Sequence, residues 1–180
     1  LAARTAARRT LVAAACGLCG RASLESLQVA APFLAPAWRV SRELAASLPA
    51  RLRRAQPGFA ATGGLHAAGL FTRDGRLVAA AEDVGRHNAV DKVVGRLLLA
   101  RRSPKRAPSP RAGDLLLAVS GRASFEIVQK AWLAGVPFVA AVSAPSTLAV
   151  DLADAAGITL LGFVRDGAFN VYAHPERLAL

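Results

Sequence analysis

Three short apolar runs in the second half of the chain constrain the fold more than any other feature of the sequence. The runs occupy residues 115–119, 138–142 and 159–164, and each has the length and composition of a strand buried on both faces. A segment of helical character follows each of the first two runs. Strands that alternate with helices form a largely parallel sheet covered by helices, because right-handed crossovers leave few other topologies.

Serine and glycine residues mark the ends of the two helices that follow these runs. Ser124 stands where the first helix should begin, and Ser143 or Ser146 stands where the second should begin. Serine favours this position because its hydroxyl accepts a hydrogen bond from a free backbone N–H group in the first helical turn. Gly157 stands where the second helix should end.

A β-hairpin and a long helix are predicted ahead of these strands. Two apolar runs, 65–71 and 77–81, flank the sequence Arg-Asp-Gly-Arg at 73–76, and Asp-Gly in that position is a strong hairpin signal. From Val90 to Leu98 the apolar residues recur with helical spacing. The hairpin therefore leads into a helix before the first buried strand.

The stretch 39–54 also has helical spacing, with an apolar residue every four positions, but Pro49 lies inside the pattern. Proline disrupts a helix interior and is favoured in the first helical turn, so we predict two short helices, with Pro49 at the start of the second. Together these elements predict an α/β fold: a three-layer α/β/α sandwich with a mixed, mostly parallel sheet.

The length and composition of the chain favour one domain without a membrane span. The chain has 180 residues, of which 53% are hydrophobic, and this is enough for a single sizeable core. The longest uncharged run, 131–150, has the length of a membrane span, but Gly135, Pro137 and Pro145 interrupt it. We interpret this run as a helix end, a turn, a buried strand and the start of the next helix.

The net charge of +11 comes mostly from arginine. The planar guanidinium binds oxyanions through two hydrogen bonds, which suits phosphate recognition, although a general preference for arginine over lysine explains many of these residues equally well. Basic clusters at 51–54 and 101–111 raise the alternative of a nucleic-acid-binding module. They lack interleaved aromatic residues and an identifiable recognition helix, so we expect no nucleic acid among the partners.

Polar loops follow the hairpin and the first two buried strands, at positions 82–88, 120–124 and 143–147. In an open α/β sheet, ligands bind beyond the carboxyl ends of the strands, where loops lead into helix N-termini. Small residues, hydroxyl groups and helix N-termini together favour an anionic ligand such as a nucleotide diphosphate. Ordinary helix capping is the alternative explanation for each loop, and Arg86 and Arg122 favour a binding site.

The only two cysteines of the chain, Cys16 and Cys19, are three positions apart. Two thiols this close share one negative charge easily, and the neighbouring Arg21 favours the thiolate, which is the nucleophilic form. Gly17 and Gly20 predict a mobile loop. Metal binding, dithiol exchange and sulfur carriage all use this spacing, so the motif alone leaves the three functions open.

Two of these alternatives are disfavoured by the rest of the sequence. A structural zinc site needs four ligands, and the zinc-deaminase pattern is missing, since Ala67 and Ala68 follow His66 and no proline precedes Cys16. A thioredoxin-like dithiol should lie between a strand and a helix, whereas this motif precedes the first predicted strand. We therefore expect no bound metal and, without a secretory signal, a cytoplasmic location.

Several runs of the chain resemble the formate dehydrogenase accessory sulfurtransferase family, FdhD. The most specific are Cys-Gly-Leu-Cys-Gly-Arg-Ala-Ser-Leu-Glu at 16–25 and Glu-Asp-Val-Gly-Arg-His-Asn-Ala-Val-Asp-Lys-Val-Val-Gly at 82–95. Similar runs at 62–68, 120–130, 143–150 and 162–172 extend the resemblance over the chain from end to end.

The resemblance implies a homodimeric sulfur carrier with a cytidine-deaminase-like core. Such a protein accepts persulfide sulfur from a cysteine desulfurase and passes it to the molybdenum bis(molybdopterin guanine dinucleotide) cofactor, which it binds as a substrate and which then activates formate dehydrogenase. Guanine nucleotides should mimic part of that cofactor. The resemblance also implies that this chain, 1–180, is the core of a longer protein whose preceding segment is missing here. Within the chain, the glycines beside the cysteines predict a mobile segment at 1–38, and prolines and basic residues predict a basic surface loop at 101–113.

The candidate site residues fall into a catalytic pair and a cofactor-binding group. By position, the resemblance assigns the persulfide to Cys16, makes Cys19 its partner, and places the cofactor-binding stretch at 163–168, where Asp166 stands at a position that is usually glycine. The predicted cofactor-binding group is Gly85, Arg86, His87, Asn88, Ser120, Gly121, Arg122, Ser124, Ser143, Phe163, Val164, Arg165, Asp166, Gly167 and Ala168. A chaperone that holds the cofactor but moves no sulfur remains an alternative function.

Overall fold

The computed structural model describes residues 31–102 and 110–179, and side chains at 31–100 and 110–179. The chain divides into two units, Leu1–Ala31 and Pro32–Leu180, and the description below concerns the second. Most of the predicted cysteine segment 1–38, and residues 103–109 of the predicted basic loop, lie outside the described residues.

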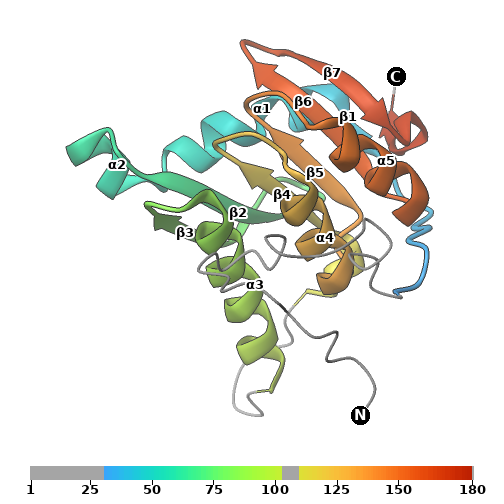
Figure 1. Ribbon diagram of the computed structural model, residues 1–180, viewed down its shortest axis with the longest axis horizontal. Coiled ribbons are helices and arrows are strands. Elements are labelled where there is room, and N and C mark those ends of the chain that lie inside the picture. Colours follow the sequence, from blue (N-terminus) through green and yellow to red (C-terminus); the bar gives the residue numbers. More distant parts are fainter. Residues whose placement is uncertain (1–30, 103–109, 180) are drawn as a thin grey trace, which may run out of the picture. The chain divides into compact units, whose positions relative to one another are not determined.

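A six-stranded mixed sheet forms the centre of this unit (Figure 1). Strands β4 and β5, and β5 and β6, are parallel neighbours, and antiparallel strands flank them on both sides. Four strands, β3, β4, β5 and β6, run in the same direction. In spatial order the strands are β3 (Leu77–Asp83), β2 (His66–Thr72), β4 (Leu115–Val119), β5 (Phe138–Ala141), β6 (Thr159–Arg165) and β7 (Ala168–Ala173).

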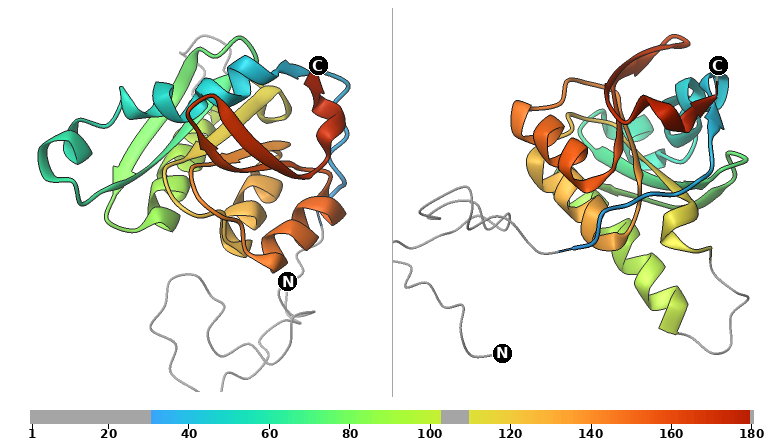
Figure 2. Two further views of the ribbon diagram at one scale, coloured as in Figure 1. Left: turned by 90° about the horizontal axis from the view of Figure 1, so that it is seen from above. Right: turned by 90° about the vertical axis from the view of Figure 1, so that its right-hand side faces the viewer.

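Helices cover both faces of the sheet, which confirms the predicted α/β fold class. Figure 2 shows α3 (Arg86–Arg102), α4 (Phe125–Ala134) and α5 (Thr147–Ala156) on one face and α1 (Arg42–Arg53) on the other. The alternating side chains of β4 explain the two cores that result. Leu115 and Leu117 are buried in the cluster beneath α3, α4 and α5, while Leu116 is buried in the cluster beneath α1.

The helix α1 corrects the prediction of two short helices, because Pro49 lies inside one continuous helix. Proline in a helix interior costs about 3 kcal/mol. The helix buries Leu48 and Leu52 completely on the same face, and each such side chain contributes about 1.5–3 kcal/mol. Burial of this face therefore outweighs the lost backbone hydrogen bond.

The hairpin and the helix boundaries in the second half follow the sequence closely. Strands β2 and β3 pair antiparallel around a turn in which Gly75 has a φ of +82°. Ser146 begins α5, and its hydroxyl accepts a hydrogen bond from the backbone N–H of Ala149. Gly157 ends that helix in the left-handed conformation. The uncharged run 131–150 covers the end of α4, all of β5 and the start of α5, as predicted.

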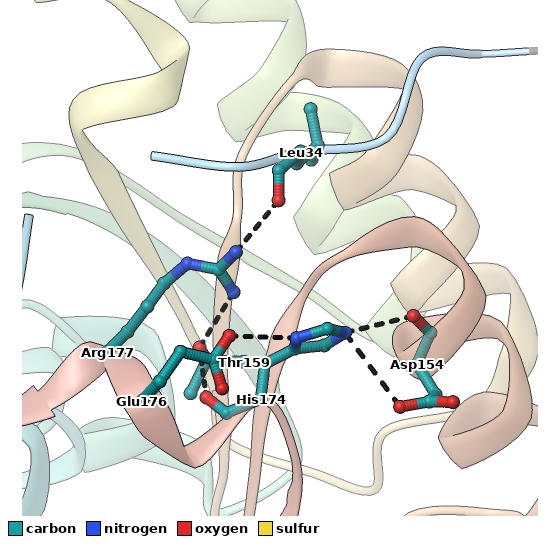
Figure 3. Close-up of polar contacts among 6 residues, drawn as sticks. All are labelled: Leu34, Asp154, Thr159, His174, Glu176 and Arg177. Carbon is teal, nitrogen blue, oxygen red and sulfur yellow. Dashed lines mark hydrogen bonds and ion pairs between the residues drawn. The ribbon is translucent and has the colours of Figure 1, made fainter. Parts of the chain in front are cut away.

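Residues near the two ends of the described chain are tied together by a buried arginine (Figure 3). The Arg177 guanidinium donates hydrogen bonds to the Thr159 hydroxyl and the Leu34 backbone carbonyl, at 3.0 and 2.8 Å. We call these three residues the Arg177 clasp. Beside it, β1 (Val40–Ser41) pairs in parallel with β8 (Leu178–Ala179). The clasp therefore fixes residue 34 at the amino end of β6.

Among the described residues, no helix is long and apolar enough to cross a lipid bilayer.

Candidate functional site

The loops at the carboxyl ends of β4, β5 and β6 are joined to one another through their backbones. Ser143 donates its N–H to the Gly121 carbonyl, and Phe163 donates its N–H to the Ser143 carbonyl, each at 3.3 Å. Ser146 donates in the same way to Ala123 at 3.0 Å. The structure thus brings together the loops at 120–124, 143–146 and 163, as expected for a mostly parallel sheet.

Residues 85–88 lie beside this group, but Arg86, His87 and Asn88 form the first turn of α3 and not the predicted loop. Gly85 and Asn88 hold this turn in place. The Gly85 N–H and the Asn88 side-chain amide both donate to one carboxylate oxygen of Asp83, at 2.9 and 3.0 Å. Lys92 forms an ion pair with the same carboxylate. Hydrogen bonds from Lys92 first, then Gly85 and Asn88, lower the pKa of Asp83 to about 2.

His87 reaches from the first turn of α3 to the start of α4. Its Nε2 lies 2.9 Å from the Ser124 hydroxyl and 3.6 Å from a carboxylate oxygen of Glu126. Burial, and then the charge of Arg86, lower the pKa of His87 in spite of the Glu126 carboxylate. The neutral ring is therefore the stable form at pH 7. Ser124 begins α4 but makes no side-chain capping bond there, because its hydroxyl faces His87.

The two candidate arginines, Arg86 at the start of α3 and Arg122 in the loop after β4, differ in their surroundings. The Arg86 Nε atom is buried, and no residue that the structure describes accepts its hydrogen bond. Gly121 packs beside this side chain, and a Cβ added there would make ordinary van der Waals contact with the Arg86 Cδ at 3.7 Å and the His66 Nδ1 at 3.4 Å. Arg122 is exposed. Arg86 is consequently the better placed of the two to meet a partly enclosed anion.

A cavity of about 570 Å³ opens beside the joined loops, between them and helices α1 and α2 (Pro57–Thr62). Ser120, Val164, Arg165 and Asp166 of the predicted group line it. The residues that sequence analysis missed come from the α1–α2 region and from the start of β2. These are Pro49, Ala50, Leu52, Arg53, Gln56, Phe59, Gly63, Gly64, Leu65 and His66, with Val142 added from the end of β5.

The predicted stretch 163–168 covers the end of β6, a turn at Asp166 and Gly167, and the first residue of β7. Phe163 and Asp166 both have a φ of +52°, and Gly167 has a φ of +77°. Aspartate tolerates this left-handed conformation better than most residues, so it can replace the expected glycine. Residues of this stretch, with Phe169 and Asn170, also line a second hollow of about 450 Å³, and Arg165 and Asp166 line both hollows. The Arg165 side chain can therefore meet an anion in either.

A carboxylate from the sheet holds α2 at the cavity. The two side-chain oxygens of Glu82 accept hydrogen bonds from the backbone N–H groups of Gly58 and Phe59, at 2.8 and 2.7 Å. The Phe59 ring in turn lies 3.9 Å from the Arg53 guanidinium carbon. The sequence offers only a weak signal for this arrangement, the proline at the start of α2, because Glu82 and its partners are more than twenty residues apart.

The catalytic pair cannot be placed against this cavity. Cys16 and Cys19 lie outside the described residues. Within 31–102 and 110–179, no group of three or more His, Cys, Asp or Glu side chains is arranged to hold a metal ion.

A family model described as the FdhD/NarQ family matches residues 1–179. The chain belongs to this family. A sulfur carrier protein FdhD from Anaeromyxobacter dehalogenans is 60% identical over 169 residues, and one from Nocardia farcinica is 54% identical over 173 residues. The matches cover 94% and 95% of this chain but only 58% and 60% of those relatives. The chain thus spans about three fifths of the length of these FdhD proteins.

A solved structure with a related sequence has a similar fold. It is the crystal structure of a protein from Desulfotalea psychrophila provisionally assigned as a formate dehydrogenase accessory protein. The TM-score is 0.72 at 32% sequence identity, and the match covers 87% of this chain and 63% of that one. The α/β fold of the FdhD/NarQ family is therefore present in the described residues.

Proposed function

We propose that this chain is the core of a sulfur carrier that serves formate dehydrogenase. Membership of the FdhD/NarQ family over residues 1–179, together with relatives named sulfur carrier protein FdhD, is the observation that carries the proposal. The sulfur donor is a cysteine desulfurase, and the acceptor is the molybdenum bis(molybdopterin guanine dinucleotide) cofactor. The protein works in the cytoplasm as a homodimer.

Sulfur uptake requires a nucleophilic thiolate, and Cys16 is the residue we assign to it. The Cys16 thiolate attacks the terminal sulfur of the donor's persulfide, so that a new S–S bond forms on Cys16. The S–S bond of the donor breaks, and the donor cysteine leaves as a thiolate. Arg21 favours the attacking thiolate electrostatically, and Cys19 is close enough in sequence to modulate it.

The cofactor is expected to bind with one guanine nucleotide half in the 570 Å³ cavity. Its volume lies within the range of about 300–1,000 Å³ typical of small-molecule sites. Arg165 supplies a cation for the diphosphate, and Ser120 lies at the end of β4, where ligands of open α/β sheets bind. The cavity thus combines an anion-binding side chain with apolar walls from α1 and α2.

Sulfur uptake is tested by intact-mass spectrometry of the full-length protein after incubation with a cysteine desulfurase and cysteine. We expect one reducible sulfur on the peptide that contains Cys16, and its loss in Cys16→Ala. The matched Cys19→Ala variant should still gain sulfur. If Cys16→Ala still activates formate dehydrogenase at the wild-type level, the protein only holds the cofactor and moves no sulfur through this residue.

Cofactor binding is tested by calorimetric titration of GDP, ADP and pyrophosphate at two salt concentrations. We expect one GDP per subunit, bound more tightly than ADP, with affinity lowered about tenfold or more in Arg165→Ala, because a charged hydrogen bond is lost. Arg76→Ala is the matched control, since Arg76 is exposed in the turn between β2 and β3. Equal affinities for GDP and ADP that both collapse at high salt would instead indicate diffuse binding to a basic surface.

A further inference from the structure

Two arginines of α1 lie over aromatic rings, one at each end of the helix. The guanidinium carbon of Arg53 lies 3.9 Å from the centre of the Phe59 ring, and that of Arg42 lies 5.6 Å from the centre of the Phe169 ring. The two arginines are the first and last residues of α1, eleven positions apart, which is about three turns and about 16 Å along the axis. They therefore leave α1 on the same side.

Each of these pairs adjoins one of the two hollows beside β6. Arg53 and Phe59 line the 570 Å³ cavity, and Phe169, over which Arg42 lies, lines the 450 Å³ hollow. Arg165 lines both hollows and lies at the end of β6. Two planar surfaces thus adjoin hollows that share one cationic side chain.

The three arginines are available to an anionic ligand. Arg42, Arg53 and Arg165 are exposed, and none forms an ion pair with an acidic side chain in the described parts of the chain, whereas Lys92 and Lys130 do. A guanidinium that lies over a ring keeps its N–H groups free for hydrogen bonds, and its other flat face can stack on a second ring. The surface that joins the two hollows therefore suits both phosphates and planar rings.

A ligand that matches these features has two flat ring systems joined by phosphates. One arm of the molybdopterin guanine dinucleotide cofactor has this composition, because a diphosphate links its guanosine to its pterin. The proposed cofactor site already assigns the guanine nucleotide to the 570 Å³ cavity and the diphosphate to Arg165. The 450 Å³ hollow, which shares Arg165 and has a volume typical of small-molecule sites, is then left for the pterin.

We propose that the 450 Å³ hollow binds the pterin of the cofactor, with Arg42 and Phe169 as its stacking surface. This assignment rests on the proposed cofactor-binding function. The exposed ring of Phe163 adds an apolar wall to the hollow. Asp166 also lines it, and its carboxylate accepts hydrogen bonds from the amino and ring N–H groups of the pterin. Arg165 stays with the diphosphate between the two rings.

Fluorescence titration of the full-length protein with free pterin, with and without saturating GDP, tests this assignment. We expect one pterin per subunit in both titrations, because the two ligands occupy different hollows. Arg42→Gln and Phe169→Leu should each lower pterin affinity about fivefold to a hundredfold, the usual effect of losing a stacking partner. Both variants should keep wild-type GDP affinity, which also shows that they are folded. Phe59→Leu should do the reverse, with weaker GDP binding and unchanged pterin binding.

Arg73→Gln is the matched control for these variants. Arg73 lies over Trp38 in the same kind of pair, at 5.9 Å, but it lines neither hollow, so both affinities should stay at the wild-type level. Competition between pterin and GDP for one site would overturn the assignment, as would wild-type pterin affinity in both Arg42→Gln and Phe169→Leu. Binding of GDP without any binding of pterin would also overturn it. A wild-type protein that binds neither GDP nor pyrophosphate would overturn the cofactor site itself.

Discussion

At the scale of single residues, His87 links a buried contact to the pH dependence of stability. Its pKa is lowered in the folded protein, first by burial and then by Arg86. The unfolded chain therefore takes up a proton more readily than the folded one. The contribution of His87 to stability is fully present above its ordinary pKa of about 6.5, and it is lost as the pH falls through the lower pKa of the folded state.

We predict that His87→Gln makes the free energy of unfolding less dependent on pH between about pH 7 and pH 5. Urea unfolding at several pH values measures this directly. Ser146→Ala is the control, because it removes the α5 cap without a titratable group and should cost about 1 kcal/mol at every pH. An unchanged pH slope in His87→Gln would show that another group causes it.

The candidate site was only partly predictable at this scale. Ser120, Arg165 and Asp166 could be placed because they follow strands whose apolar runs are visible in the sequence. Gln56 and Phe59 could not, because their position depends on Glu82, which is distant in sequence and caps α2 only after the sheet has formed. Likewise, nothing local shows that the Ser124 hydroxyl turns to His87 instead of capping its own helix.

At the scale of elements, the local sequence pattern predicted the strands and most of the helices that cover them. The form of α1 depended instead on a balance between the cost of proline and the burial of apolar side chains. The runs that became β4 and β5 are buried throughout, and β6 is buried except at Phe163 and Arg165, so the composition of these runs identifies them. The prediction of two helices in place of α1 was wrong because the sequence shows the cost of Pro49 in a helix interior. It does not show the burial of Leu48 and Leu52 against the sheet, which outweighs that cost.

The end of α5 permits a controlled test of how the segment before α1 is packed. Gly157 and Gly63 both have left-handed backbones, with φ of +73° and +68°. A Cβ on Gly157 would collide with the Leu34 carbonyl oxygen, whereas one on Gly63 would meet nothing within 4 Å. Replacement of either glycine by alanine therefore strains the backbone in the same way, but only replacement of Gly157 also creates a steric clash.

We predict that Gly63→Ala lowers the free energy of unfolding by about 1 kcal/mol and that Gly157→Ala lowers it by at least about 2 kcal/mol more. Urea denaturation of both variants separates the steric contribution from the backbone strain. Equal losses in the two variants would mean that Leu34 moves aside without cost.

At the scale of the whole unit, the Arg177 clasp joins residues that are far apart in sequence. Desolvation lowers the pKa of Arg177, yet its guanidinium donates hydrogen bonds to the Thr159 hydroxyl and the Leu34 carbonyl. We predict that Arg177→Met lowers the free energy of unfolding by about 2–4 kcal/mol, because the Leu34 carbonyl loses its charged partner.

Arg111→Met provides the comparison for this prediction. Arg111 is exposed, and its replacement should change the free energy of unfolding by less than about 0.5 kcal/mol. Hydrogen exchange at the Leu34 amide, which bonds to the Ala156 carbonyl, should accelerate in Arg177→Met and stay unchanged in Arg111→Met. Protection of that amide in both variants would show that the backbone contact holds without the clasp.

The clasp also sets an order of events while the protein is being made. Leu34 and Arg177 are 143 residues apart, and ribosomes add about 5–20 residues per second, so Leu34 is made about 7 to 30 seconds before its partner. During that interval the strands of the sheet can pair and the Leu34 amide can bond to the Ala156 carbonyl, but the Leu34 carbonyl lacks Arg177 and β1 lacks β8. Complete attachment of this segment is therefore among the last steps of folding, and a ribosome that stalls before Arg177 leaves the Leu34 carbonyl and β1 without these partners.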